Sequence, residues 1–69
     1  MENRVEDYQV RVIEEAQQLE DKHEKLLTFM DGERFKILPE AEKQRLCRQA
    51  NIMSAYLDVL EERIDAFKE

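Results

Sequence analysis

The stretch FMDGERFKILPEAEK, residues 29–43, decides the fold, because it holds the only glycine and the only proline of this 69-residue chain. Gly32 comes just after Met30 and Asp31, where a glycine in the left-handed conformation commonly ends a helix. Pro39 suits the first turn of a new helix, because its missing N–H would have no partner there in any case. The stretch therefore predicts a corner between two helices.

The corner also holds apolar side chains, which a turn exposed to solvent does not require. Phe35, Ile37 and Leu38 follow the glycine within six residues. Phe35 and Leu38, three positions apart, predict a short helical turn that plugs the open end between the two helices. The alternative interpretation is an exposed recognition loop.

Apolar residues recur with a period of 3.5 on both sides of the corner. Before it, alternate steps of four and three reach eight positions: Val5, Gln9, Val12, Ala16, Leu19, His23, Leu26 and Met30. All of them except Gln9 and His23 are apolar. After it, the same steps reach seven positions, all apolar: Leu46, Ala50, Met53, Leu57, Leu60, Ile64 and Phe67. One such stripe per segment is typical of helices that pack side by side.

Signals at the helix ends predict the bounds. Asn3, with Glu6 three positions later, resembles a capping box, so the first helix is expected over about 3–30. Pro39 opens the second helix, which is expected over about 39–67. The chain is thus predicted to be all-α, an antiparallel helical hairpin with a short helical turn at the corner.

A hairpin of this size needs further stabilisation. A compact domain this small buries only about 60% of the surface that its unfolded chain exposes. One cysteine forms no internal disulfide, and one histidine with one cysteine does not make a four-ligand zinc site. Association with a partner chain is the means that remains. We expect a single domain, residues 1–69, that self-associates into a helical bundle.

A second apolar row on the later helix indicates where association would occur. Ile52, Tyr56 and Val59, with Cys47 nearby, lie about 100° around the helix from the main stripe. A row of this kind left in water would form a patch typical of interaction surfaces. We predict a homo-oligomer, a four-helix dimer or a ring, although the row would suit a foreign chain equally well. The alternative is that these side chains are simply tolerated at the surface.

Catalytic and metal-binding constellations are not evident. Cys47 and His23 would approach each other in a hairpin, but no third residue orients them and no glycine-rich loop supplies an oxyanion site. Glu20 and His23 have the Glu-x-x-His spacing of di-metal bundles, yet the inward-facing glutamates of such a site are missing from the second helix. We expect no enzymatic activity, no cofactor and no bound metal.

Composition excludes several other classes. The net charge is −6 at pH 7 with 41% charged residues, so we expect no nucleic acid as a partner. The acidic, polar N-terminus is unlike a signal peptide, and no apolar run is long enough to span a membrane. A lone thiol suits a reducing compartment. These features predict a soluble cytoplasmic protein.

Charge varies along the chain. Residues 1–21 carry net −5, residues 22–48 net +2, and residues 49–69 net −3. In a hairpin this places an acidic base beside a mildly basic tip, where arginines can hold phosphate by bidentate contacts. The candidate ligands at the tip are Lys43, Arg45 and Arg48. The alternative is ordinary solubilising charge that neighbouring glutamates balance.

Motifs along nearly the whole chain form a familiar pattern. Its most distinctive pieces are Tyr8-Gln9-x-Arg11-Val12 at the start and Arg63-Ile64-x-x-Phe67 at the end. Between them the matching positions are Glu15, Leu19, Lys22, Lys25, Leu26, Phe29, Phe35, Leu38, Glu42, Gln49, Met53, Tyr56 and Leu60. The chain resembles the short helical bacteriophage proteins named as related to a gene product of a crAss-like phage. Cys47 departs from that pattern, in which a leucine is expected.

The resemblance implies a viral accessory protein that acts in the host bacterial cytoplasm, in a family of largely unassigned role. Small oligomeric helical phage proteins of this general kind include inhibitors of host defence, and some sequester cyclic nucleotides between subunits. By this analogy we expect sequestration of a nucleotide-derived immune signal, a cyclic nucleotide or another phosphate-bearing small molecule, or binding of a host defence protein. The alternatives are an adaptor or inhibitor of another host protein and a minor virion or assembly component.

The family's polar residues give a second candidate ligand site at the base of the hairpin. Tyr8, Gln9 and Arg11 are expected to lie beside Arg63. Gln9 interrupts an apolar stripe, so its side chain is expected to have a hydrogen-bond partner. That bond would either fix the register of the hairpin or contact a ligand.

Overall fold

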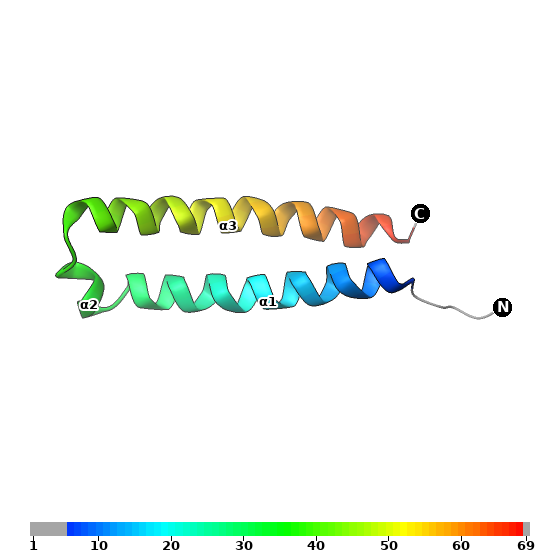
Figure 1. The fold of residues 1–69 in the computed structure, drawn as a ribbon, viewed down its shortest axis with the longest axis horizontal. Coiled ribbons are helices and arrows are strands. Elements are labelled where there is room, and N and C mark those ends of the chain that lie inside the picture. Colours follow the sequence, from blue (N-terminus) through cyan, green and yellow to red (C-terminus); the bar gives the residue numbers. More distant parts are fainter. Residues whose placement is uncertain (1–5, 69) are drawn as a thin grey trace.

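The computed structural model describes residues 6–68, and it is a hairpin of two long antiparallel helices (Figure 1). The elements are α1 (Asp7–Met30), α2 (Glu33–Lys36) and α3 (Glu40–Ala66). The short α2 lies at the corner, and the two described chain ends lie together at the other end, called the base here (Figure 1). The predictions of an all-α chain and of a helical hairpin are confirmed.

The start of α1 is set by Glu6, which has extended backbone angles (φ −68°, ψ 154°). Its N–H donates to the side-chain oxygen of Gln9 over 3.0 Å, which satisfies a donor that a helix start leaves free. The described helix therefore begins at Asp7, whereas the predicted start, at about residue 3, lies outside the described residues. The predicted capping residue, Asn3, lies outside the described residues.

Gly32 does not adopt the predicted left-handed conformation. Its backbone is extended (φ −100°, ψ 177°), and it precedes α2 as that helix's N-terminal cap residue. The chain leaves α1 through Asp31, whose angles (φ −86°, ψ −2°) stay near the helical region. The next helix begins so soon that an extended residue, rather than a left-handed one, makes the break.

The corner is the predicted helical plug. Phe35, on α2, is half-buried, and its ring meets that of Phe29 edge-on, with centroids 6.3 Å apart at 88°. Leu38 is also half-buried, and its N–H donates to the Phe35 carbonyl over 3.1 Å. Ile37, by contrast, is 83% exposed. Aromatic pairs of this geometry contribute about 1 kcal/mol beyond the area they bury.

Pro39 ends the corner, with a helical φ of −57° but an extended ψ of 148°. Its carbonyl accepts hydrogen bonds from the N–H groups of Glu42 and Lys43, both at 3.0 Å. These bonds begin α3 at Glu40, one residue after the predicted start. The helix ends at Ala66, one residue before the predicted end.

The core lies where the two apolar stripes meet. Leu60 has no exposed surface, and Val12 and Ala16 pack around it with 5% and 8% of their surfaces exposed. Leu19, Ile64 and Phe67 close over this cluster. All of these residues were predicted from the 3.5-residue period. We call these two apolar stripes the seams. The seam positions are 9, 12, 16, 19, 23, 26 and 30 on α1, and 46, 50, 53, 57, 60, 64 and 67 on α3 and the residue after it.

A second aromatic pair closes the base. The Tyr8 ring meets the Phe67 ring edge-on, with centroids 5.7 Å apart at 87°. The hairpin thus has an aromatic pair at each end of its core. Over residues 6–68, no helix combines the length and apolar character that crossing a bilayer requires.

Replacement of Leu60 tests the core. Leu60→Ala removes the only fully buried large side chain of the described residues, and we expect a loss of about 3 kcal/mol in the free energy of unfolding. Ile37→Ala is the matched control, because that aliphatic side chain is 83% exposed and its loss is expected to cost under about 0.5 kcal/mol. Urea unfolding followed by circular dichroism measures both, and equal effects would contradict this core.

Candidate ligand-binding face

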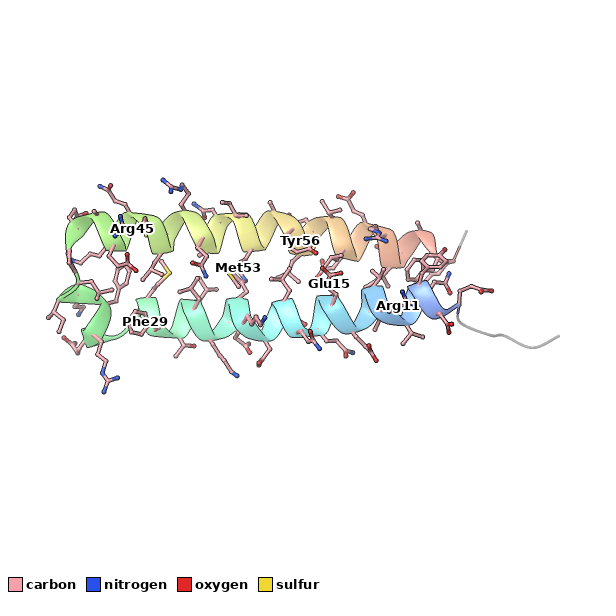
Figure 2. The ribbon with its side chains drawn as sticks, in the orientation of Figure 1. Arg11, Glu15, Phe29, Arg45, Met53 and Tyr56 are labelled. Carbon is pink, nitrogen blue, oxygen red and sulfur yellow. The ribbon has the colours of Figure 1, made fainter. Side chains whose placement is uncertain are left out.

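The hairpin has two broad faces, one on each side of the paired seams. In antiparallel helices, positions just before a seam residue share one face, and positions just after a seam residue share the other. Two contacts across the seams establish this. The Tyr56 hydroxyl donates to the Glu15 carboxylate, and the two side chains point toward each other in Figure 2. Tyr8 packs on Phe67. Tyr8, Glu15 and Tyr56 each precede a seam residue.

The face that carries Tyr56 and Glu15 is strongly basic. The described positions that precede seam residues hold five basic side chains and one acidic side chain, a net charge of +4, and two of the five, Lys25 and Arg45, form salt bridges to Asp21 and Glu42. The basic residues are Arg11, Lys22, Lys25, Arg45 and Arg63. We call it the basic face.

The opposite face is strongly acidic. Its described positions carry six acidic side chains and one basic side chain, a net charge of −5. The acidic residues are Glu20, Glu24, Asp31, Asp58, Glu61 and Asp65. We call it the acidic face. The charge of the chain is therefore divided across the hairpin as well as along it.

The predicted apolar row lies on the basic face. Ile52, Tyr56 and Val59 are 62%, 44% and 51% exposed. Cys47 is exposed too, but it follows Leu46 and so lies on the acidic face. The structure therefore does not bring Cys47 together with the other three predicted interface residues.

His23 is half-buried on the α1 seam, away from the face that carries Cys47. Within residues 6–68, His23 and Cys47 form no hydrogen bond with each other. Within the same residues, no group of three or more histidine, cysteine or acidic side chains lies close enough to hold a metal ion.

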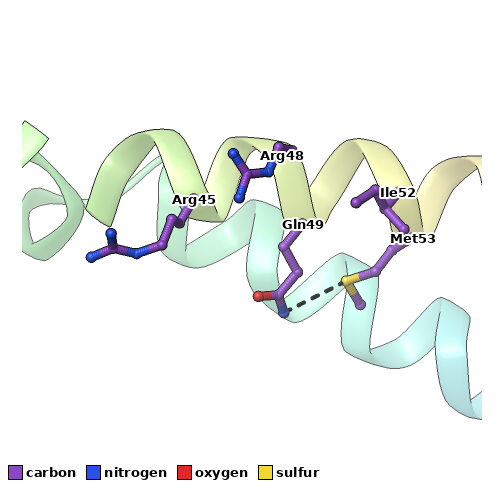
Figure 3. Close-up of a pocket in the computed structure, with 5 residues that line it drawn as sticks. All are labelled: Arg45, Arg48, Gln49, Ile52 and Met53. Atoms are coloured by element: carbon purple, nitrogen blue, oxygen red, sulfur yellow. Dashed lines mark hydrogen bonds between the residues drawn. The ribbon is translucent and has the colours of Figure 1, made fainter. Parts of the chain in front are cut away.

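A pocket of about 330 Å³ opens on the tip half of the basic face. Its lining comes entirely from α3: Arg45, Arg48, Gln49, Ile52 and Met53 (Figure 3). The Gln49 side-chain nitrogen lies 4.0 Å from the Met53 sulfur across it. Two guanidinium groups thus stand beside an aliphatic and a thioether side chain, which can accommodate an anion next to an apolar group.

Arg45 is oriented by a neighbour on the same helix. Its guanidinium donates twice to one Glu42 carboxylate oxygen, over 2.7 Å and 2.9 Å. Arg48 is one turn further along and is exposed. Lys43, the third predicted tip ligand, is half-buried and does not line the pocket.

The predicted base site is assembled in part. Arg11 follows Tyr8 by one turn on α1, and Arg63 precedes Phe67 by one turn on α3. Because Tyr8 contacts Phe67, both arginines lie on the same stretch of the basic face. Gln9 does not join them, because its side-chain oxygen caps the start of α1. The hydrogen bond expected for Gln9 exists, but its partner is Glu6 in the same turn, so it does not set the register of the hairpin.

The division of charge between the two faces was missed by sequence reasoning. Summing charge along the chain shows an acidic base and a basic tip, and it averages over the faces. Sorting each charged residue by whether it precedes or follows a seam position would have found the two faces, because the seam positions themselves were predicted.

A family model described as Sequestin matches residues 6–66. The chain belongs to the Sequestin family. The match extends over the corner and essentially all of both long helices, so both faces fall within the region that defines the family. Comparison with curated proteins and comparison with solved structures each gave no match. The predicted relation to phage proteins stays a prediction.

The Tyr56–Glu15 hydrogen bond tests how firmly the basic face is held. Tyr56→Phe keeps the ring and removes the hydroxyl donor. We therefore expect the free energy of unfolding to fall by about 1 kcal/mol. The double variant with Glu15→Ala should then lose little more than Tyr56→Phe alone, because either change by itself removes the same hydrogen bond. Thermal unfolding of the four proteins measures the coupling. Additive losses would show that the bond contributes no stability.

Proposed function

We propose that this Sequestin-family protein is a non-enzymatic sequestering protein that binds a phosphate-bearing, nucleotide-derived small molecule. The family's name supports a sequestering role. The pocket on α3 carries the proposal, because it places Arg45 and Arg48 beside Ile52 and Met53. Phosphate oxygens suit guanidinium forks, and a base or sugar suits the apolar side chains.

The two arginines contribute differently. Arg45 is already ion-paired with Glu42, which fixes its guanidinium but offsets part of its charge. Within residues 6–68, Arg48 has no ion-pair partner, so its donors are free for an incoming anion. Arg48 is therefore the residue on which phosphate binding depends most. Arg11 and Arg63 provide a second pair of guanidinium groups at the base of the same face.

The biological setting of the proposal comes from the resemblance to phage accessory proteins. The protein would act in the cytoplasm of the infected bacterium and would remove a nucleotide-derived immune signal from the host's defence. Binding without turnover is sufficient for this role. Self-association would increase the number of ligand-binding sites in each oligomer.

A second candidate function is binding of a host defence protein. The observation that favours it is the exposed row Ile52, Tyr56 and Val59, because an apolar row with an aromatic centre is typical of helix-mediated protein recognition. The two candidates differ in cargo. A sequestering protein needs no protein partner.

Native mass spectrometry of the purified protein, before and after incubation with a bacterial metabolite extract, tests the proposal. We expect a discrete added mass of a phosphate-bearing molecule. No added mass, together with stable co-purification of one host protein, would favour the second candidate.

Charge reversal locates the site, with cyclic mononucleotides and dinucleotides as probes in calorimetric titration. Arg48→Glu should weaken binding at least about tenfold, because it replaces an attraction to phosphate with a repulsion. Lys36→Glu is the matched control: it makes the same charge change on exposed α2, outside the pocket, and should change affinity less than about threefold. Equal losses in the two variants would place the ligand elsewhere.

A further inference from the structure

The two faces of the hairpin are opposite in charge, and this limits how copies of the chain can associate. Two basic faces brought together would oppose +4 with +4, and two acidic faces would oppose −5 with −5. A basic face against an acidic face opposes +4 with −5. Like charges across an interface are costly, and complementary charges steer partners together.

We propose that Sequestin-family hairpins of this sequence associate head to tail, with the basic face of one copy on the acidic face of the next. Such a contact uses two different surfaces of each chain, so it builds a ring if the rotation closes and an open stack if it does not. The inference does not depend on the ligand proposed above.

Apolar side chains support the same pairing. On the basic face the exposed apolar row, Ile52, Tyr56 and Val59, belongs to α3, while Tyr8 and Phe29, 55% and 37% exposed, belong to α1. On the acidic face the exposed large apolar side chains belong to α1: Val10 at 40% and Leu27 at 46% exposure. A basic face laid on an acidic face therefore brings exposed apolar side chains of the two copies together, as well as opposite charges.

In one such arrangement, α3 of one copy lies over α1 of the next. It turns the second hairpin end for end, so the tip half of one copy lies over the base half of its neighbour. Lys22 and Lys25, in the tip half of α1, then come opposite Asp58 and Glu61, in the base half of α3. All four side chains are exposed in the single hairpin. Opposite charges thus meet across the contact in this arrangement.

Two double variants test the proposal in the ligand-free protein. The basic-face variant is Lys22→Glu with Lys25→Glu, and the acidic-face variant is Asp58→Lys with Glu61→Lys. Lys25 gives up a salt bridge to Asp21 at 3.0 Å, but both partners are exposed, so such a pair contributes little to folding. Circular dichroism confirms that each variant keeps its helical content.

Analytical ultracentrifugation at low salt gives the readout. We expect the wild-type protein to assemble, each variant alone to sediment as a monomer, and an equimolar mixture to form complexes that contain both variants. The mixture recovers because each variant keeps the face that the other has lost. Assembly of the wild type should also decrease at about 1 M salt, where screening acts within about 3 Å.

Three results would overturn the inference. A symmetric contact between two basic faces predicts that the acidic-face variant assembles alone, and a contact between two acidic faces predicts the same of the basic-face variant. A wild-type protein that stays monomeric at every concentration and at low salt excludes both kinds of contact. Nucleotide binding is tested separately, by the Arg48→Glu titration.

Discussion

The close contact of two apolar seams around Leu60 is the interaction on which the rest of the molecule depends. Leu60 is enclosed by Val12 and Ala16, and the small alanine side chain lets the two helices approach. Because the seams run along almost the full length of both helices, they fix the rotation of each helix about its own axis. Every other side chain is then assigned to one face or the other. The division of charge follows from the seams, although no charged residue is part of the core.

Much of this fold could be predicted from residue types and their spacing. The period of 3.5 identified the core residues, and Phe35 with Leu38 identified the plug at the corner. The errors were local. A glycine after a helix predicts a left-handed helix end, but α2 starts directly after Gly32 and needs an extended N-cap residue there. Glycine can adopt either conformation, so its presence alone did not distinguish them. In the described residues α1 begins at Asp7, where Gln9 satisfies the N–H of Glu6 from within the first turn.

The candidate site was predicted less completely, and the reason is geometric. Arg45 and Arg48 were identified by type, and the structure places both in one pocket. Lys43 is only two residues before Arg45, yet it lies in line with the seam, is half-buried and does not line the pocket. Cys47 was grouped with Ile52 by proximity in sequence, but five residues on a helix separate two side chains by more than a third of a turn. Position relative to the seam decides these cases, and nearness along the chain does not.

The pocket and the proposed interface share one side chain, which links the two proposals physically. Ile52 lines the pocket and also begins the exposed apolar row. A pocket built from a single helix has few walls of its own, so a small molecule in it stays partly in water. A second chain laid over the basic face would add a wall without changing the arginines. Affinity for a ligand and the tendency to assemble would then depend on each other.

The aromatic contact at the corner has a consequence for how the hairpin forms. Phe29 and Phe35 are six residues apart, so their rings meet after the closure of a very short loop, whereas the Tyr8–Phe67 contact requires almost the whole chain. We therefore expect folding to nucleate at the corner and to proceed toward the base as successive turns of the seams meet. Each step brings together residues only slightly further apart along the chain than the previous step. A hairpin of this kind avoids one large entropic barrier and should fold quickly for its modest stability.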